Sequence, residues 1–242
     1  MTRMSASGKE KFKTLNDVFD MFTERNLNKM ISQNYFDGLE SPLSIGKEAN
    51  IFTAKANDDT RIVKIYRLQT CDFNKMYYYI RSDPRYSDLK NAQREVIFAW
   101  AHREYRNLLK AREAGARVPT VYAFMKNIVV MEFIGDDLAA QKVKQDEPKD
   151  KKKFAEETIK QMQLLYKAGL VHGDLSGFNI LNHRDMPVFI DMSQSTTLEN
   201  ANAQEYLVRD VKNVCKMFNG WGLKYTEEQI LKKVIGTKKV QA

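Results

Sequence analysis

The sequence predicts an α+β fold of two lobes, in which an antiparallel sheet with one long helix is followed by a mainly helical lobe. Three observations predict this fold class. Two pairs of strand-like segments flank short polar turns at residues 57–60 and 126–127, a pattern typical of antiparallel hairpins. Between the hairpins, residues 91–113 carry apolar side chains at helical spacing and no proline. After residue 153, helical spacing predominates.

Residues 1–35 are predicted to form N-terminal helices. Thr14-Leu15-Asn16-Asp17 has the pattern of a helix-opening box, and apolar residues follow at helical spacing. A second helix is expected around Leu27 to Gln33. The apolar residues of the first helix are Leu15, Val18, Phe19 and Phe22.

Residues 36–135 are assigned to the first lobe. Ile51 and Thr53, then residues 62–66, predict the two strands of a hairpin that follows a glycine loop. The long helix over 91–113 is expected to end near Gly115. Residues 121–125 and 128–133 then predict a second hairpin in the same sheet.

Residues 136–242 are assigned to the second lobe. The polar, charged stretch between Gly135 and Lys153 contains Pro148, which favours a link between the lobes. A helix is predicted over 154–168, with Gly169 closing it, because glycine readily adopts the left-handed conformation found after helix ends. Two further helices are predicted over 202–218 and 226–235.

The composition describes an ordinary globular chain. Its 242 residues are 43% hydrophobic and 29% charged, which is enough for a real core. No apolar run approaches the roughly 20 residues that cross a bilayer, and the polar, basic N-terminus does not resemble a secretory signal. We therefore expect a cytoplasmic protein. Cys71 and Cys215 do not form a C-x-x-C pair, so we expect neither a zinc site nor a disulfide framework.

The chain is basic, with a formal net charge of +8 and a pI near 9.3. This charge favours an acidic partner, and RNA or ribonucleoprotein is preferred over a membrane because no basic amphipathic anchor is evident. Lysines that only solvate the surface would produce the same net charge. Both interpretations stay open.

One segment indicates phosphoryl transfer. The run from Val171 to Leu181 contains Asp174 and Asn179, and the next strand-like segment ends at Asp191. Phosphoryl transfer requires an oriented acceptor hydroxyl and metal ions that neutralise phosphate oxygens. Asp174 would hold the acceptor, while Asn179 and Asp191 offer the oxygen ligands that magnesium prefers. Either aspartate alone could simply cap a turn or end a strand, but their joint spacing favours a site.

A second candidate group is the ammonium of Lys64. It lies mid-strand between Ile62 and Tyr66, where burial would be costly without a partner. Glu95 or Glu104 of the long helix could supply that partner, and we prefer Glu104. On an edge strand, Lys64 would instead face water.

The glycine loop ahead of that strand is a third candidate. Its backbone N–H groups could cover phosphates. It is neither a G-x-G-x-x-G loop nor a Walker A motif, because Ser41 and Glu48 stand at two positions that the latter requires to be glycine and Ser or Thr. Its place before Lys64 nevertheless favours a phosphate-covering role over an ordinary turn. The loop comprises Ser44, Ile45, Gly46, Lys47, Glu48, Ala49 and Asn50.

Taken together, these motifs resemble the RIO family of atypical serine kinases over about residues 35–235. The tyrosine-rich run Met76-Tyr77-Tyr78-Tyr79-Ile80-Arg81 is similar to the first, Rio-one branch, in its compact archaeal-like form. The resemblance lies in segments 44–50, Lys64, Met131-Glu132-Phe133-Ile134-Gly135, His172-Gly173-Asp174-Leu175-Ser176 with Asn179, and Ile190-Asp191-Met192-Ser193-Gln194.

The resemblance implies a trimmed, two-lobed protein-kinase-like fold that binds ATP with magnesium or manganese. Residues 44–50 would cover the phosphates, and Lys64 would contact them while pairing with Glu104. Backbone groups of Glu132 and Ile134 would hold the adenine. The role of base would belong to Asp174, and the metal would lie on Asn179 and Asp191. The aspartate matching Asp191 can also accept phosphate in this family, which would give an ATPase-like switch.

The resemblance also implies partners and regulation. Members of the family act in maturation of the small ribosomal subunit, so we expect rRNA and ribosomal proteins of the pre-ribosomal small subunit as partners, and neither membrane nor DNA. The stretch from Cys71 to Asn91 matches a mobile loop in which Ser82 or Ser87 could be autophosphorylated.

The sequence departs from ordinary protein kinases. His172-Gly173-Asp174 stands in place of His-Arg-Asp, Asp191-Met192-Ser193 in place of Asp-Phe-Gly, and no Ala-Pro-Glu follows. Three alternatives therefore stay open: a small-molecule phosphotransferase of the aminoglycoside or choline kinase type, a ribosome-assembly ATPase switch without a protein substrate, and a pseudokinase. Gly177, where relatives often carry a larger residue, is expected to loosen the loop.

Overall fold

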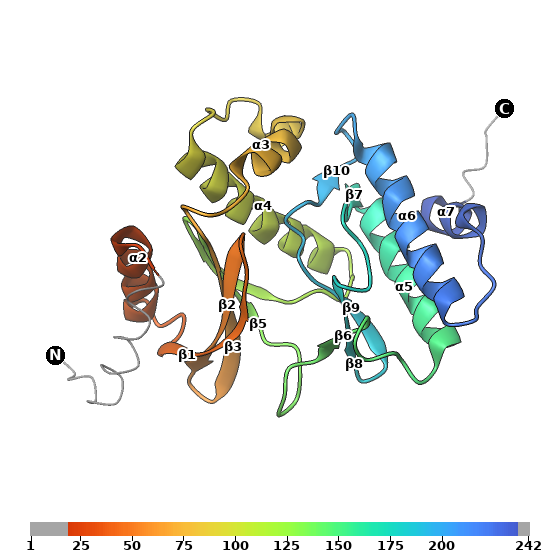
Figure 1. Cartoon of the computed structure of the whole chain (residues 1–242), viewed down its shortest axis with the longest axis horizontal. Helices are drawn as coiled ribbons and strands as arrows, with labels where there is room; N and C mark the ends of the chain where they lie inside the picture. The colour runs from red at the N-terminus through yellow and green to blue at the C-terminus, as the bar shows by residue number, and fades with distance from the viewer. Residues whose placement is uncertain (1–18, 237–242) are drawn as a thin grey trace.

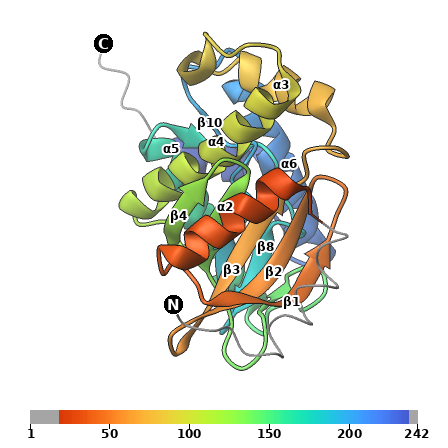
Figure 2. The same cartoon turned by 90° about the vertical axis from the view of Figure 1, so that its left-hand side faces the viewer.

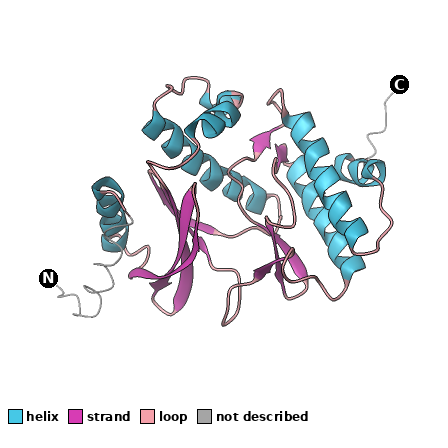
Figure 3. Cartoon of the chain, viewed as in Figure 1, coloured by secondary structure: helices cyan, strands magenta, loops and turns pink. Residues whose placement is uncertain are grey.

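The computed structural model describes residues 19–236, with the large sheet toward the N-terminal end of the molecule and α5 (Lys151–Lys167), α6 (Ala203–Gly220) and α7 (Glu227–Ile235) at the opposite end (Figures 1 and 3). The predicted α+β fold of two lobes is confirmed. An antiparallel sheet and the long helix α4 (Gln93–Glu113) form the first lobe. The second lobe is dominated by α5, α6 and α7.

Five antiparallel strands make the large sheet, in the order β1-β2-β3-β5-β4. Both predicted hairpins are present, and their turns contain Asn57 and Lys126 with positive φ angles of 56°. This conformation is uncommon outside glycine and is typical of tight turns. The strands are β1 (Gly38–Ile45), β2 (Ala49–Ala56), β3 (Asp59–Tyr66), β4 (Val121–Met125) and β5 (Ile128–Glu132).

The two faces of this sheet bury different partners, because side chains alternate along a strand. Phe52 and Val63 face helix α2 (Met21–Ser32), which lies across the outer face of the sheet (Figure 2). Ile62 and Tyr66 face the other way and join the core around α4. Position 64 on β3 therefore points to the inner face.

A helix is present between residues 19 and 35 as predicted, but the expected division into two helices was wrong. Between residues 19 and 35 there is one helix, α2, and it spans the proposed break before Leu27. It begins after Asp20, whose carboxylate accepts hydrogen bonds from the N–H groups of Phe22 and Thr23 at 3.0 and 3.1 Å. Asp20 is thus the N-cap of this helix. The predicted box at 14–17 lies outside the described residues.

The prediction of a loop over Cys71–Asn91 was also wrong. Helix α3 (Phe73–Arg81) and a short 3-10 helix, η1 (Pro84–Tyr86), occupy much of this stretch. Asp72 caps α3 by accepting from Lys75 N at 3.0 Å, and the apolar residues Met76 and Ile80 are buried four residues apart. This i, i+4 spacing after a capping aspartate was a readable helix signal.

The three predicted helices of the second lobe are confirmed as α5 (Lys151–Lys167), α6 (Ala203–Gly220) and α7 (Glu227–Ile235). Gly169 follows α5 with a φ of 74°, and Thr226 and Gln229 form a capping box at α7. Two small sheets were not anticipated in full. One contains β6 (Gln141–Lys142), β8 (Ile180–His183) and β9 (Met186–Phe189), and the other β7 (Leu170–Val171) and β10 (Thr196–Thr197).

One apolar core extends through both lobes. It joins Ile62 and Met131 of the sheet, Trp100 of α4, and Phe154 and Phe218 of the second lobe. Cys71 and Cys215 are buried without a bond to each other. In residues 19–236 no helix combines the length and the apolar character that spanning a membrane requires.

Candidate active site

The predicted lysine pair is present at the inner face of the sheet. Lys64 Nζ lies 2.7 Å from Glu104 Oε1 on α4 and 3.0 Å from Asp191 Oδ1, which follows β9. Tyr66 donates its hydroxyl to Glu104 Oε2 at 2.6 Å. Glu95, the alternative partner, is exposed. Since β3 lies in the middle of the sheet, the edge-strand interpretation of Lys64 does not hold.

The charges in this cluster depend on one another. Burial alone would lower the pKa of Lys64, but the carboxylates of Asp191 and Glu104 raise it well above its usual value, so the ammonium stays charged. Burial raises the pKa of Glu104 despite the neighbouring ammonium. The pKa of Asp191 falls to about 2: burial opposes ionisation, but Lys64 and the Ser193 hydroxyl favour the carboxylate.

Asp191 is held in an unusual backbone conformation, with a φ of 60°. Non-glycine residues adopt this region at a cost, and such strain concentrates at functional sites. Its Oδ1 accepts from Ser193 Oγ at 2.7 Å as well as from Lys64. Within residues 19–236, no hydrogen bond engages its Oδ2, which leaves that oxygen for another partner.

Asp174 and Asn179 belong to the loop between β7 and β8. Asn179 Nδ2 donates to the backbone carbonyl of Asp174 at 2.8 Å and to its Oδ2 at 3.1 Å. Gln194 Nε2 reaches the same Oδ2 at 3.3 Å. Burial and then the charge of Asp191 raise the pKa of Asp174, while Arg209 and Lys75 oppose the shift. The two aspartates therefore lie within electrostatic reach of each other, as the spacing predicted.

The loop of residues 172–179 carries Asp174 and Asn179 and is called the motif loop below. A residue that was not predicted from the sequence, Asp210, holds it in place. Asp210 of α6 is fully buried, and its carboxylate accepts from Gly173 N at 2.7 Å and Leu175 N at 2.8 Å. Burial raises its pKa to about 7, although both N–H groups favour the charged form. The readable signal was an aspartate on the buried face of α6, between Leu207 and Val211.

Two further contacts shape the same loop. His172 Nε2 lies 3.1 Å from the backbone carbonyl oxygen of Ile190. Burial lowers the pKa of His172 to about 4, so the ring is neutral at pH 7. Gly177 was expected to loosen the loop, but the structure indicates close packing. A Cβ there would lie 3.3 Å from both Met217 and Val143, so glycine allows the loop to pack against α6.

The glycine loop is the predicted turn between β1 and β2. Its carbonyls are engaged by the segment after β3, through Arg67 N to Glu48 O at 3.0 Å and Thr70 Oγ1 to Lys47 O at 3.0 Å. Gly46 N donates to Ala49 O at 3.1 Å. No hydrogen bond among residues 19–236 engages the N–H groups of Lys47 and Glu48, which fits a phosphate cradle.

Not every predicted residue of this loop points to the site. Asn50 is buried on the side of β2 that faces α2, with Phe52 and opposite to Lys64. Its side chain is therefore not brought to the lysine cluster, and only its backbone could contact a nucleotide. Ser44 and Ile45 are exposed at the end of β1.

The predicted adenine contacts lie at the link between the lobes. The Glu132 side chain accepts from Thr120 N and Oγ1 at 2.9 and 2.7 Å, so it is turned toward β4. Ile134 accepts through its carbonyl from Ala140 N at 2.9 Å, and no hydrogen bond within the described chain engages its N–H. A free backbone donor at this link is compatible with the predicted role of Ile134.

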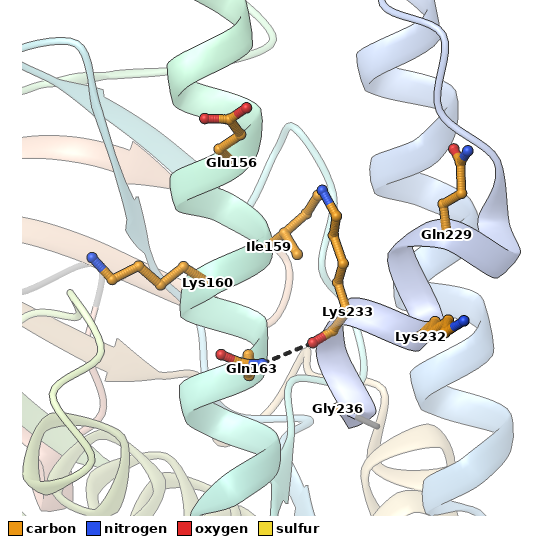
Figure 4. A pocket seen from close by; sticks show the side chains of 8 residues that line it. All are labelled: Glu156, Ile159, Lys160, Gln163, Gln229, Lys232, Lys233 and Gly236. Carbon is orange, nitrogen blue, oxygen red and sulfur yellow. Dashed lines mark hydrogen bonds between the residues drawn. The ribbon is translucent and has the colours of Figure 1, made fainter. Parts of the chain in front are cut away.

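A pocket lies between α5 and α7, and none of the residues above lines it (Figure 4). Gln163 closes one side by donating to Lys233 O at 2.9 Å. It has no pair of carboxylates, and it contains none of the predicted site residues. Its lining comprises Glu156, Ile159, Lys160, Gln163, Gln229, Lys232, Lys233 and Gly236.

Residues 50–230 match the family model described as the RIO domain. The chain belongs to the RIO family. It is 38% identical over 226 residues to the RIO-type serine/threonine-protein kinase Rio1 of Haloferax volcanii, covering 91% of this chain and 77% of that protein. It is 39% identical over 211 residues to Rio1 of Methanocaldococcus jannaschii, covering 86% and 72%. The chain is therefore a Rio1-type member of this kinase family, as the motifs indicated.

A solved RIO structure supports the fold. The Rio2 kinase of Chaetomium thermophilum, in an ADP/Mg²⁺-phosphoaspartate complex, superposes with a TM-score of 0.66 at 21% identity. The match covers 88% of this chain and 66% of that one. At this identity the likeness shows the trimmed kinase-like fold, and the kinase relatives show that the chain is an ATP-using enzyme of the protein-kinase type.

Proposed function

We propose that this RIO kinase is an ATP- and Mg²⁺-dependent atypical serine kinase and ATPase that forms an aspartyl phosphate on Asp191. We further propose that it acts in the cytoplasm during maturation of the small ribosomal subunit. The observation that carries the chemistry is the convergence of Lys64, Glu104, Asp174 and Asp191 from separate segments of the chain.

The donor set fits a magnesium ion. Residues 19–236 hold no group of three His, Cys, Asp or Glu side chains that would make an all-protein metal cage. Magnesium usually takes only one or two carboxylates and completes its shell with waters and substrate phosphates. Asp191 Oδ2 is unengaged in the described chain. Asn179 donates through Nδ2 to Asp174, so the amide oxygen of Asn179 could serve as a metal ligand. When bound, the cation would neutralise phosphate oxygens.

Lys64 and Asp174 have separate tasks in the proposal. Glu104 fixes the Lys64 ammonium, which would contact the ATP phosphates as a point charge. The carboxylate of Asp174 accepts hydrogen bonds only at Oδ2 within the described residues, so its Oδ1 could orient a serine hydroxyl or a water. Its raised pKa suits a group that takes a proton in the transfer step.

The aspartyl phosphate would form by in-line attack of the Asp191 carboxylate on the γ-phosphorus of ATP. The bond to the bridging β–γ oxygen breaks, and ADP leaves with that electron pair. Attack by water on the same phosphorus would then release inorganic phosphate and restore the carboxylate. The low pKa of Asp191 keeps the attacking group ionised. The name of the Chaetomium thermophilum Rio2 complex records a phosphoaspartate in a relative.

The proposed role in ribosome maturation is supported by the charge of the chain. The net charge of +8 suits a partner rich in phosphates, such as rRNA with its ribosomal proteins. Manganese could replace magnesium at the same oxygen ligands. Membership of the RIO family favours a protein kinase over the small-molecule phosphotransferase alternative.

The test is incubation with γ-labelled ATP, with and without EDTA. We expect metal-dependent labelling that hydroxylamine and alkali remove, because acyl phosphates are labile to both. Asp191→Asn should abolish this label, since an amide is not a nucleophile, and asparagine tolerates the positive φ at this position. Asp58→Asn, in an exposed turn, is the matched control. Labelling that persists in EDTA or in Asp191→Asn would contradict the proposal.

A further inference from the structure

A buried carboxylate outside the proposed site lies between α3 and η1. Asp83 has no exposed side-chain surface, and its Oδ2 lies 2.6 Å from Arg85 Nη2 and 3.3 Å from Arg103 Nε. Burial alone would raise the pKa of Asp83, but the two guanidinium groups lower it. The carboxylate is therefore ionised and shared by two arginines.

Arg103 connects this carboxylate to the segment after Asp191. It is wholly buried on α4, and its Nε donates to Ser195 O at 3.0 Å while its Nη2 donates to Gln194 O at 3.2 Å. Burial lowers the pKa of Arg103 to about 10, which still leaves it charged at neutral pH. A planar guanidinium fixed by a carboxylate can orient several donors at once.

A second route begins at Arg85. Its Nη1 donates to Asn107 Oδ1 at 2.8 Å, which fixes the orientation of that buried amide. Asn107 Nδ2 consequently faces the other way and donates to Met192 O at 2.9 Å and Ser195 O at 2.7 Å. Both routes from Asp83 end on backbone carbonyls of residues 192–195.

The residues that carry these carbonyls directly follow Asp191, whose backbone conformation is strained. Asp191 has a strained positive φ of 60°, and such a conformation persists only when the surroundings determine it. The same segment also contacts Asp174 through Gln194 Nε2 at 3.3 Å. Anchoring residues 192–195 therefore fixes both carboxylates of the proposed site.

We propose that Asp83 is a positioning residue for the metal site: through Arg103, and through Arg85 and Asn107, it holds residues 192–195 and thereby orients Asp191 toward Mg²⁺. The α3–η1 segment, which the sequence marked as a loop, becomes a structural part of the metal site. This inference rests on the proposed function, because it requires that Asp191 binds the cation.

The test compares metal-dependent and metal-free nucleotide binding in Asp83→Asn. This change keeps the side-chain shape and removes the charge. We expect calorimetry with ADP to show about a tenfold higher Mg²⁺ concentration at half-maximal enhancement of binding, as is typical when an outer partner of a metal ligand is lost. ADP affinity in EDTA should equal that of the unaltered chain, because Glu104 holds the Lys64 ammonium at 2.7 Å without any hydrogen bond to residues 192–195.

Matched variants separate the outcomes. Asp88→Asn alters an exposed aspartate of the same segment and should leave the Mg²⁺ requirement unchanged. If Asp83→Asn does not fold, Arg85→Met carries the test, and it should raise the Mg²⁺ requirement in the same direction. An unchanged Mg²⁺ requirement, or an equal loss of ADP affinity with and without metal, would overturn the inference. Absence of Mg²⁺-dependent ADP binding in the unaltered chain would instead overturn the proposed function.

Discussion

At the scale of single residues, the site is an arrangement of charges that stabilise one another. Lys64 lies between two carboxylates, and the buried charges of Lys64 and Glu104 would each be costly without the other. Asp210 and His172 are buried ionisable groups that position the motif loop through backbone contacts. We therefore expect substitutions of these side chains to change both the free energy of unfolding and the rate of ATP turnover.

Replacing Lys64 tests this coupling. Lys64→Met leaves Glu104 and Asp191 without their cation, and loss of one partner of a buried pair typically costs about 3–5 kcal/mol of unfolding free energy. ATP turnover should fall by about 100-fold or more, because a fixed charge on the phosphates is lost. Urea unfolding and phosphate release measure the two effects. Lys55→Met, at an exposed position on β2, should change neither. Full turnover in Lys64→Met would exclude the assigned role.

Asp210 predicts a specific pH dependence. Its pKa is raised to about 7 in the folded chain from an ordinary value of 3.8, so the folded state holds a proton that the unfolded state has released between these values. Its contribution to stability is therefore full below pH 3.8 and is lost as pH rises through 7. Asparagine does not titrate. The free energy of unfolding of the unaltered chain should therefore fall relative to that of Asp210→Asn between pH 5 and pH 8.

Urea unfolding of both proteins at the two pH values measures this difference, and all other titrating groups are common to both. A difference independent of pH would show that Asp210 is already ionised at pH 5.

At the scale of elements, short loops are fixed by helices that lie far away in the sequence. The loop of residues 172–175 is held by α6, and residues 192–195 are held by α4. The two loops also touch each other at Gly173. A Cβ at this glycine would lie 2.9 Å from Gln194 O, and its φ is 81°.

A pair of glycine variants tests this contact. Gly173→Ala and Gly222→Ala both place alanine in a left-handed conformation, at a cost of about 1–3 kcal/mol each. Only Gly173 has a neighbour within 4 Å of the new Cβ. We expect both variants to lose stability in thermal unfolding, but only Gly173→Ala to lose ATP turnover beyond its loss of folded protein. Equal turnover in the two folded variants would show that the loop contact does not matter.

At the scale of the whole molecule, the two lobes share one apolar core. The shared core runs from the inner face of the sheet through α4 to α5, α6 and α7. A second cluster is confined to α2 and the outer face of the sheet. Since the site lies where elements of both lobes meet, its geometry depends on the whole core.

The shared core predicts cooperative unfolding. The chain has two tryptophans, Trp100 on α4 and Trp221 at the end of α6, and each reports on one lobe. In Trp221→Phe and in Trp100→Phe, the fluorescence midpoint in urea should coincide with the circular dichroism midpoint of the same variant. Separate midpoints in either variant would show that the lobes unfold independently.

Local patterns were sufficient for most of the fold. Both hairpins, the long helix and the helices of the second lobe follow from alternation, helical spacing and turn residues, all of which are encoded within short stretches. The prediction failed at α2, where one continuous helix replaces the expected break before Leu27, and at α3, where the spacing of Met76 and Ile80 was not recognised. The pairing of Lys64 with Glu104 was within reach because a buried lysine requires a carboxylate.

The sequence by itself determined the chemistry: which side chains could bind phosphate and metal, and on which element each would lie. Only the tertiary structure decided what holds them, because Asp210, Arg103 and Asn107 bind backbone groups far from them in the chain, and Asp83 fixes the Arg103 side chain. It also turned Asn50 away from Lys64. Such bonds depend on how elements pack, and the backbone groups that they engage are the same for every residue type, so no local pattern records them.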